Sequence, residues 1–146
     1  MAEYMVSFTA GEAQRLVGVD QYHLRYWDKT AVVQPHGRAA SGSGSRRFYT
    51  MLDVVQLKVV RRLREEGLSL AKIRTALKFI RDLPDEPAPL AELEIATDGR
   101  RIFVRRSDDA VIDVLAHQYV LRLPLADLLA EVQAGVAPSS FIGVMV

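Results

Sequence analysis

One short predicted helix, residues 21–29, carries the side chains best suited to chemistry in this sequence. At about 100° per residue, Leu24 and Trp27 share one side of that helix. The opposite side carries two tyrosines and two cations: Tyr22, Arg25, Tyr26 and Lys29. Exposed aromatic rings usually have a partner, and cations pair with phosphates. The pattern predicts a surface that binds a polyanion. For Tyr26 there is an alternative, in which part of its side chain packs against a neighbouring element.

Other chemistry has little support in the sequence. His23, His36 and His117 are too scattered for a metal site, and a solvated turn explains Asp108-Asp109 better than a catalytic carboxylate pair. No nucleophile motif, P-loop or dinucleotide fingerprint occurs. The chain has no cysteine, which excludes thiolate ligands and disulfides. We therefore predict neither an enzyme nor a metal or cofactor site.

The charges are unevenly distributed along the 146 residues. Residues 1–81 hold 14 Lys and Arg against 7 Asp and Glu, a balance of +7, whereas residues 82–146 hold 5 against 11, a balance of −6. A basic half favours a polyanionic partner. The N-terminal residues carry no signal-peptide pattern, and no stretch is apolar enough to span a membrane. We expect a cytoplasmic, nucleoid-associated protein.

Two short helices are predicted near the N-terminus. Thr9 and Glu12 form a capping box for the first, with Phe8 as a hydrophobic staple, and this helix runs to Leu16 or Val17. It stops at Gly18, and Asp20 then caps the second helix, Gln21–Lys29. Two short helices joined by a turn with glycine are typical of a helix-turn-helix.

A basic wing is predicted after the second helix. The segment Gly37–Ser45 consists mainly of glycine, alanine and serine and contains no acidic residue, and Arg46-Arg47-Phe48-Tyr49 follows it. Gln34-Pro35 and Phe48-Tyr49 can pair as the legs of a hairpin. Hydroxyls, amides and guanidinium groups hold phosphate oxygens, so Arg38, Arg46 and Arg47 are expected on DNA. A plain flexible loop is the alternative, and Tyr49 has an equally supported packing role.

Two further helices complete the predicted domain. Thr50 caps Met51–Glu66, which Gly67 ends, and Ser69 caps a helix whose apolar spacing runs from Leu70 to Ile80. The core is expected to bury Leu24, Trp27, Leu52, Val55, Leu63 and Ile73. The fold class is therefore mainly α with small β elements, in which residues 1–81 form a winged helix-turn-helix domain.

A small α+β module is predicted at the C-terminal end. Prolines and acids mark residues 82–90 as a linker, and residues 91–146 follow. Strands are expected at Leu93–Thr97, at Ile102–Arg106 after an Asp98-Gly99 turn, and at Tyr119–Leu123. Pro124 should lie in the first turn of a helix that ends near Glu131 or Val132 and stops at Gly135.

Five blocks of this sequence resemble the MerR-type transcription regulators. The blocks are Phe8–Glu12, Val17–Val19, Leu24–Asp28, Arg47–Tyr49 and Arg62–Ile73, in register across about residues 6–80. The sequence departs from the family in having Trp27 where a second tyrosine is usual, and in its Gly- and Ser-rich wing. Pro84, Pro87 and Pro89 interrupt the long helix that commonly makes the family's dimer.

The resemblance implies a sequence-specific transcription regulator that binds a pseudo-palindromic promoter element in double-stranded DNA. The second helix would enter the major groove, the wing would follow the backbone, and the DNA would be bent and untwisted. RNA polymerase is then a further partner. The candidate DNA contacts are Thr9, Arg15, Gln21, Tyr22, His23, Arg25, Tyr26, Lys29, Arg38, Arg46, Arg47 and Tyr49.

Two alternatives remain open at this level: an architectural DNA-bending protein similar to excisionases, and an adaptor that acts through its acidic half. The residues beyond the linker favour the regulator. A palindromic site needs two readers, so we expect a homodimer. Its predicted surface combines the hairpin Leu93–Arg106, the strand Tyr119–Leu123 and the apolar end Phe141, Ile142, Val144 and Val146. A monomeric module with a frayed tail is the alternative.

Overall fold

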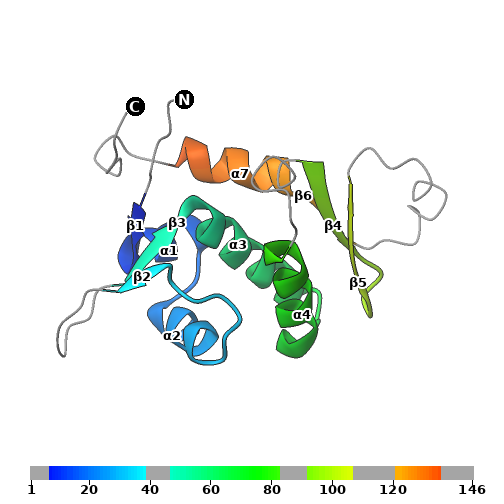
Figure 1. The fold of residues 1–146 in the computed structure, drawn as a ribbon, viewed down its shortest axis with the longest axis horizontal. Coiled ribbons are helices and arrows are strands. Elements are labelled where there is room, and N and C mark those ends of the chain that lie inside the picture. The colour runs from blue at the N-terminus through cyan, green and yellow to red at the C-terminus, as the bar shows by residue number, and fades with distance from the viewer. Residues whose placement is uncertain (1–6, 39–46, 83–91, 107–120, 136–146) are drawn as a thin grey trace. The chain divides into compact units, whose positions relative to one another are not determined.

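The computed structural model describes residues 7–38, 47–82, 92–106 and 121–135 (Figure 1). The chain divides into two compact units, residues 1–58 with 131–146 and residues 59–130. Helices α3 (Met51–Glu65) and α7 (Leu125–Ala134) contribute residues to both. Helices and small antiparallel sheets make up the described part, which confirms the predicted fold class. Most of the predicted linker 82–90 and the apolar end 136–146 lie outside it, so the predicted domain boundaries remain a prediction.

A three-stranded sheet forms the base of the wing in the first unit. β1 (Ser7–Thr9) and β2 (Gly37–Arg38) both pair antiparallel with β3 (Arg47–Thr50). The predicted hairpin leg Gln34-Pro35 was wrong, because the paired residues are Gly37 and Arg38 and because Pro35 has no N–H to give to a ladder. The sequence reading also missed β1, whose partner lies some forty residues further along the chain.

The predicted helix-turn-helix is confirmed almost to the residue. α1 (Ala10–Val17) begins in a capping box, in which the Thr9 hydroxyl accepts from the Glu12 N–H and the Glu12 carboxylate accepts from the Thr9 N–H. The helix ends at Gly18, whose φ of +81° lies in the left-handed region that glycine adopts freely. α2 (Gln21–Lys29) follows with Asp20 as its N-cap.

Two longer helices follow the wing sheet. α3 begins in a second capping box between Thr50 and Asp53, and α4 (Leu70–Arg81) begins at Ser69 as predicted. Burial raises the pKa of the Asp53 carboxyl, against the opposing effect of the Thr50 N–H that it accepts. Five of the six predicted core residues are buried, and Leu52 is only half-buried.

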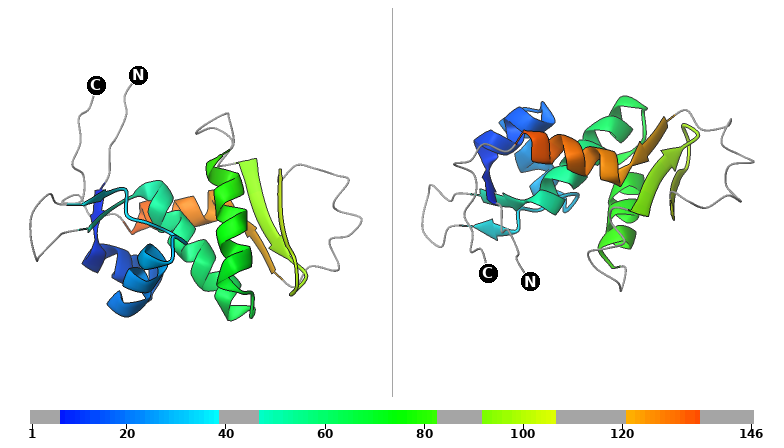
Figure 2. Two further views of the ribbon diagram at one scale, coloured as in Figure 1. Left: turned by 60° about the horizontal axis from the view of Figure 1, so that its bottom comes forward. Right: turned by 90° about the horizontal axis from the view of Figure 1, so that it is seen from above.

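The second unit contains a small antiparallel sheet in the order β5-β4-β6 (Figure 2). The strands are β4 (Leu93–Thr97), β5 (Ile102–Arg106) and β6 (Leu121–Pro124). The predicted hairpin exists, but its loop has four residues, since Thr97 pairs with Ile102. Pro124 ends β6 opposite Glu94 and is not part of the helix, which runs from Leu125 to Ala134 before Gly135.

The central strand β4 is buried along its whole length, including its one charged residue. The Glu94 carboxylate is 1% exposed and accepts hydrogen bonds from both Nε and a terminal nitrogen of Arg122 on β6. A bidentate arginine compensates a buried carboxylate well. Within the described residues, no helix is long and apolar enough to cross a membrane.

Candidate nucleic-acid interface

The start of α2 is fixed by its cap. The Asp20 carboxylate accepts from the His23 N–H at 2.9 Å and lies 2.6 Å from the His23 Nδ1. These bonds, the backbone one first, hold the pKa of Asp20 below its usual value. The first turn of α2 is therefore held in one geometry, and the His23 side chain is tied to the cap while remaining half exposed.

The outer side of α2 presents the side chains that the sequence placed there. We call this surface the recognition face and define it as Gln21, Tyr22, Arg25, Tyr26 and Lys29, all of which are exposed. Tyr22 is 70% exposed and Tyr26 43% exposed. Their rings stack with 6.3 Å between centroids and 5° between planes, so each tyrosine holds the other in place.

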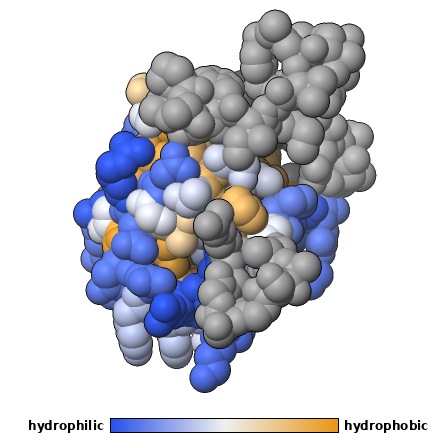
Figure 3. Space-filling view, turned by 90° about the vertical axis from the view of Figure 1, so that its left-hand side faces the viewer, coloured by the Kyte–Doolittle hydropathy of each residue, from blue (hydrophilic) through white to orange (hydrophobic). Residues whose placement is uncertain are grey.

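The inner side of α2 explains why the recognition face is directed outward. Leu24 is fully buried and Trp27 is 4% exposed, as the helical spacing predicted. The His23 ring also lies 5.5 Å from the Trp27 ring, centroid to centroid. Burial of Leu24 and Trp27 fixes the rotation of the helix about its axis, because turning it would expose both. Figure 3 views the side of the first unit and shows a largely hydrophilic described surface with small apolar patches.

The remaining candidates on α1 have different surroundings. Arg15 is exposed near the C-terminal end of α1. Thr9 is exposed too, but its hydroxyl and its backbone N–H both take part in the capping box. Thr9 thus caps the N-terminus of α1, the helix that precedes α2.

The wing candidates separate into two groups. The side chain of Arg38 and all of Arg46 lie outside the described residues, as does the predicted wing tip. Tyr49 is fully buried opposite the equally buried Phe8 in the wing sheet, which agrees with the packing role that the sequence allowed for it. A buried ring at this register anchors the base of the wing.

Arg47 joins the wing to α2. Its Nε lies 3.3 Å from Oδ2 of Asp28, and the two side chains are 20% and 6% exposed. Because this nitrogen has no hydrogen-bond partner among the described atoms, the contact is an ion pair without hydrogen-bond geometry. The sequence reading missed Asp28. Its signal was the inner-face spacing that it shares with Leu24 and Trp27, at i, i+3 and i+4.

No metal site accompanies this surface in the described residues. They contain no group of three His, Asp or Glu side chains that could hold a metal ion. Cysteine is missing from the whole sequence. The structure thus combines a rigid short helix with aromatic and basic groups on its outer side and, next to it, a wing sheet tied to the helix by an ion pair.

Comparison with known proteins identifies the family. Residues 8–80 match the model of the MerR HTH family of regulatory proteins. The chain belongs to this family. Its members are DNA-binding transcription regulators and not enzymes, so residues 8–80 form a DNA-binding regulatory domain. This confirms the predicted family and the predicted helix-turn-helix. It also agrees with the prediction of a regulator and not an enzyme.

Several named proteins are similar in sequence to this MerR-type chain. The HTH-type transcriptional regulator Rv1830 of Mycobacterium tuberculosis is 34% identical over 111 residues, which are 76% of this chain and 48% of that protein. Streptomyces coelicolor HspR, named as a heat shock protein, is 30% identical over 109 residues, which are 74% and 67% of the two chains. HmrR of Sinorhizobium medicae is 36% identical over 72 residues, 49% and 47%. The chain spans about half the length of the first of these relatives.

Proposed function

We propose that this MerR-type protein binds a promoter element in double-stranded DNA and regulates transcription from it. The observation that carries the proposal is the recognition face, where exposed Tyr22 and Arg25 stand on a helix whose rotation is fixed by buried residues. A helix of this width fits the major groove, and an arginine there can bind guanine through two hydrogen bonds. Gln21 and Lys29 lie at the two ends of the same helix and reach adjacent phosphates.

The wing lies on the DNA backbone in this proposal. Arg38 and Arg46 supply the phosphate contacts. The Arg47–Asp28 ion pair sets the position of β3, and β2 with its Arg38 pairs with β3. Contacts on both sides of the groove allow the protein to bend and untwist the promoter. The recruitment or repositioning of RNA polymerase would then follow from the changed DNA path.

A regulator is better supported than an excisionase-like bending protein. The similarity to Rv1830 covers 111 residues, so it must include residues outside the 8–80 family match. An excisionase-like protein, which ends soon after its wing, would not be expected to share residues outside the DNA-binding domain with a transcription regulator.

Two copies are needed to read a pseudo-palindromic site. We propose that the second unit supplies the pairing, with β5 as an available edge strand of its sheet. The test is sedimentation equilibrium on the full chain at tens of micromolar, without DNA. A truncation at Asp82 would be a poor test, because it also removes Val132, which is buried in the first unit. A chain that stays monomeric would contradict this pairing.

The central experiment measures base reading by Arg25. The preferred site is first recovered by genome-wide capture of bound DNA. Binding to that site and to a shuffled sequence is then compared by fluorescence anisotropy. Arg25→Ala should weaken specific binding by about 1–3 kcal/mol and non-specific binding less.

Arg62→Ala is the matched control. It also removes one positive charge, but Arg62 is an exposed residue of α3 that is not part of the recognition face. It should weaken binding to both DNAs slightly and equally. If Arg25→Ala also weakens both DNAs equally, Arg25 contacts phosphate and does not read bases. If the captured DNA shows no preferred site, the proposed function itself is wrong.

A further inference from the structure

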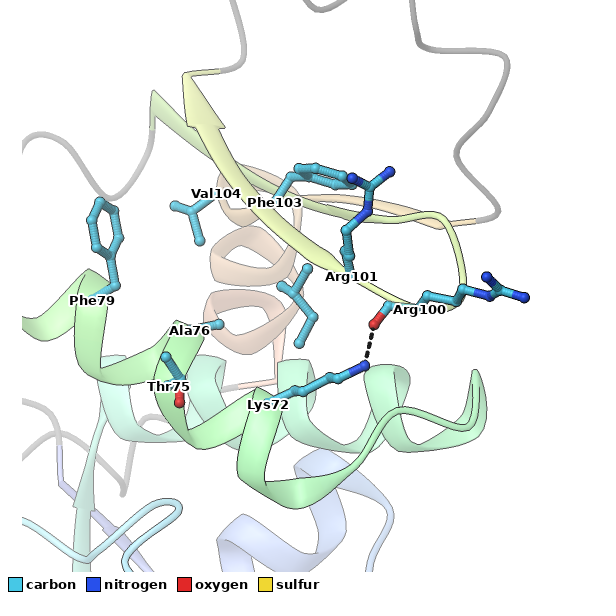
Figure 4. Close-up of a pocket in the computed structure, with 9 residues that line it drawn as sticks. Lys72, Thr75, Ala76, Phe79, Arg100, Arg101, Phe103 and Val104 are labelled. Atoms are coloured by element: carbon cyan, nitrogen blue, oxygen red, sulfur yellow. Dashed lines mark hydrogen bonds between the residues drawn. The ribbon is translucent and has the colours of Figure 1, made fainter.

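An apolar cavity opens in the second unit between α4 and β5. It has a volume of about 550 Å³, within the range typical of small-molecule sites. Ala76 and Phe79 line it from α4, and Ile102 and Val104 line it from β5 (Figure 4). Ile102 and Val104 are two residues apart on a strand and therefore share a face. Phe79 is 56% exposed, an unusual fraction for a phenylalanine beside an apolar cavity.

The charged groups at this cavity are all basic among its described lining residues, and the hydroxyl of Thr75 is a neutral polar group beside them. Lys72 stands at the mouth, where its Nζ donates to the Arg100 carbonyl oxygen at 2.6 Å. An ammonium group has three N–H donors, so two remain for another acceptor. Arg101 also lines the cavity, and its guanidinium carbon lies 5.2 Å from the centre of the Phe103 ring.

The acid nearest to Arg100 and Arg101 in the chain, Asp98, is already engaged. Its carboxylate accepts from the backbone N–H groups of Arg100 and Arg101 and forms an ion pair with the Arg101 side chain at 3.1 Å. These bonds lower the pKa of Asp98 to about 2, with the Arg101 N–H as the largest cause. Asp98 therefore holds the loop in shape, and Lys72 remains the cation directed at the cavity mouth.

We propose that this cavity binds a small organic anion with an apolar body, whose charged group meets Lys72 and whose body lies between α4 and β5. Apolar walls favour a ring or chain of carbon atoms, and a basic mouth with no acid among its described lining residues favours a carboxylate or sulfonate over a cation. The binding is independent of the proposed DNA contacts, because no lining residue belongs to the recognition face or the wing.

The test uses two fluorescent probes with the same kind of aromatic body. Anilinonaphthalene sulfonate carries one negative charge, and phenylnaphthylamine carries none. The full-length protein should bind one sulfonate probe per chain, and octanoate should displace it. Lys72→Gln should weaken the sulfonate probe roughly two- to fivefold and leave the uncharged probe unchanged.

Lys78→Gln is the matched control, because Lys78 is an exposed lysine of α4 outside the cavity, paired with Asp82. It should change neither affinity. Ala76→Leu fills the cavity and should abolish binding of both probes, with circular dichroism and Trp27 emission reporting whether the chain stays folded. If that variant unfolds, Phe79→Ser replaces it, since it removes an exposed wall and should weaken both probes.

Four results would overturn the proposal. They are no saturable probe site, equal effects of the two lysine substitutions, undiminished binding to the folded filled variant, and probe binding that disappears as the chain dimerises. The last result would assign the cavity to a second copy of this chain.

Discussion

The ion pair between Arg47 and Asp28 makes a sharp prediction about how the wing is held. Replacing Arg47 with glutamine removes the cation and keeps a polar side chain that reaches the position of the arginine Nε. Asp28, which is 4% exposed, then loses a positive charge 3.3 Å from its carboxylate. The folded state should become less stable, although the recognition face is untouched.

The magnitude follows from the burial of the two partners. Removing one partner of a fully buried pair costs about 3–5 kcal/mol, and an exposed pair contributes about 0–1 kcal/mol. Asp28 is buried, Arg47 is 20% exposed, and Asp28 has further interactions. We therefore expect Arg47→Gln to lower the free energy of unfolding by about 1–3 kcal/mol. Asp28→Asn in the same chain should restore part of this loss.

The assay is urea unfolding followed by the emission of Trp27, the single tryptophan of the chain and the neighbour of Asp28. Arg25→Gln is the matched control, because it removes an exposed arginine of α2. Its effect on stability should stay within about 0.5 kcal/mol. The dependence of DNA affinity on salt adds a second readout. Arg46→Gln should reduce the slope of log K against log salt by roughly 0.9, and the ion-paired Arg47 should contribute less.

Equal stabilities of the Arg47→Gln and Arg25→Gln proteins would refute the reasoning, because the Arg47–Asp28 ion pair would then contribute nothing to the free energy of unfolding. An additive double variant, with no coupling between Asp28→Asn and Arg47→Gln, would refute it equally.

Three further predictions concern the folded state. Trp27→Ala should cost about 3–5 kcal/mol in urea unfolding, and wild-type Trp27 emission should be blue-shifted and resist iodide quenching; a red-shifted, readily quenched spectrum would contradict its burial. Asp53→Ala should destabilise the start of α3 by about 1 kcal/mol, whereas Asp53→Asn should change stability little because an amide oxygen can still accept the Thr50 N–H; equal losses would contradict the cap. Because folding lowers the pKa of Asp98 from 3.8 to about 2, its contribution to stability should be complete above pH 3.8 and disappear as the pH falls toward 2, so that wild type and Asp98→Ala converge in acid urea titrations; a constant difference would contradict this.

The sequence determined the features that depend on neighbours in the chain. Capping residues Thr9, Asp20, Thr50 and Ser69 begin their helices where predicted, because a cap satisfies N–H groups only two or three residues away. The two faces of α2 follow from helical spacing alone, which is why its exposed tyrosines and buried Leu24 were predicted correctly.

Only the tertiary structure decided the features that depend on distant partners. The strand Ser7–Thr9 exists because Arg47–Thr50 pairs with it, and three residues carry no readable period. The spacing of Asp28 places it near the inner side of α2, but only the fold brings Arg47 beside it as a partner. Glu94 becomes a central buried residue only once Arg122 on β6 supplies its partner. Local hydrogen bonds are encoded within a few residues, whereas burial and ion pairing depend on which segments the whole fold brings together.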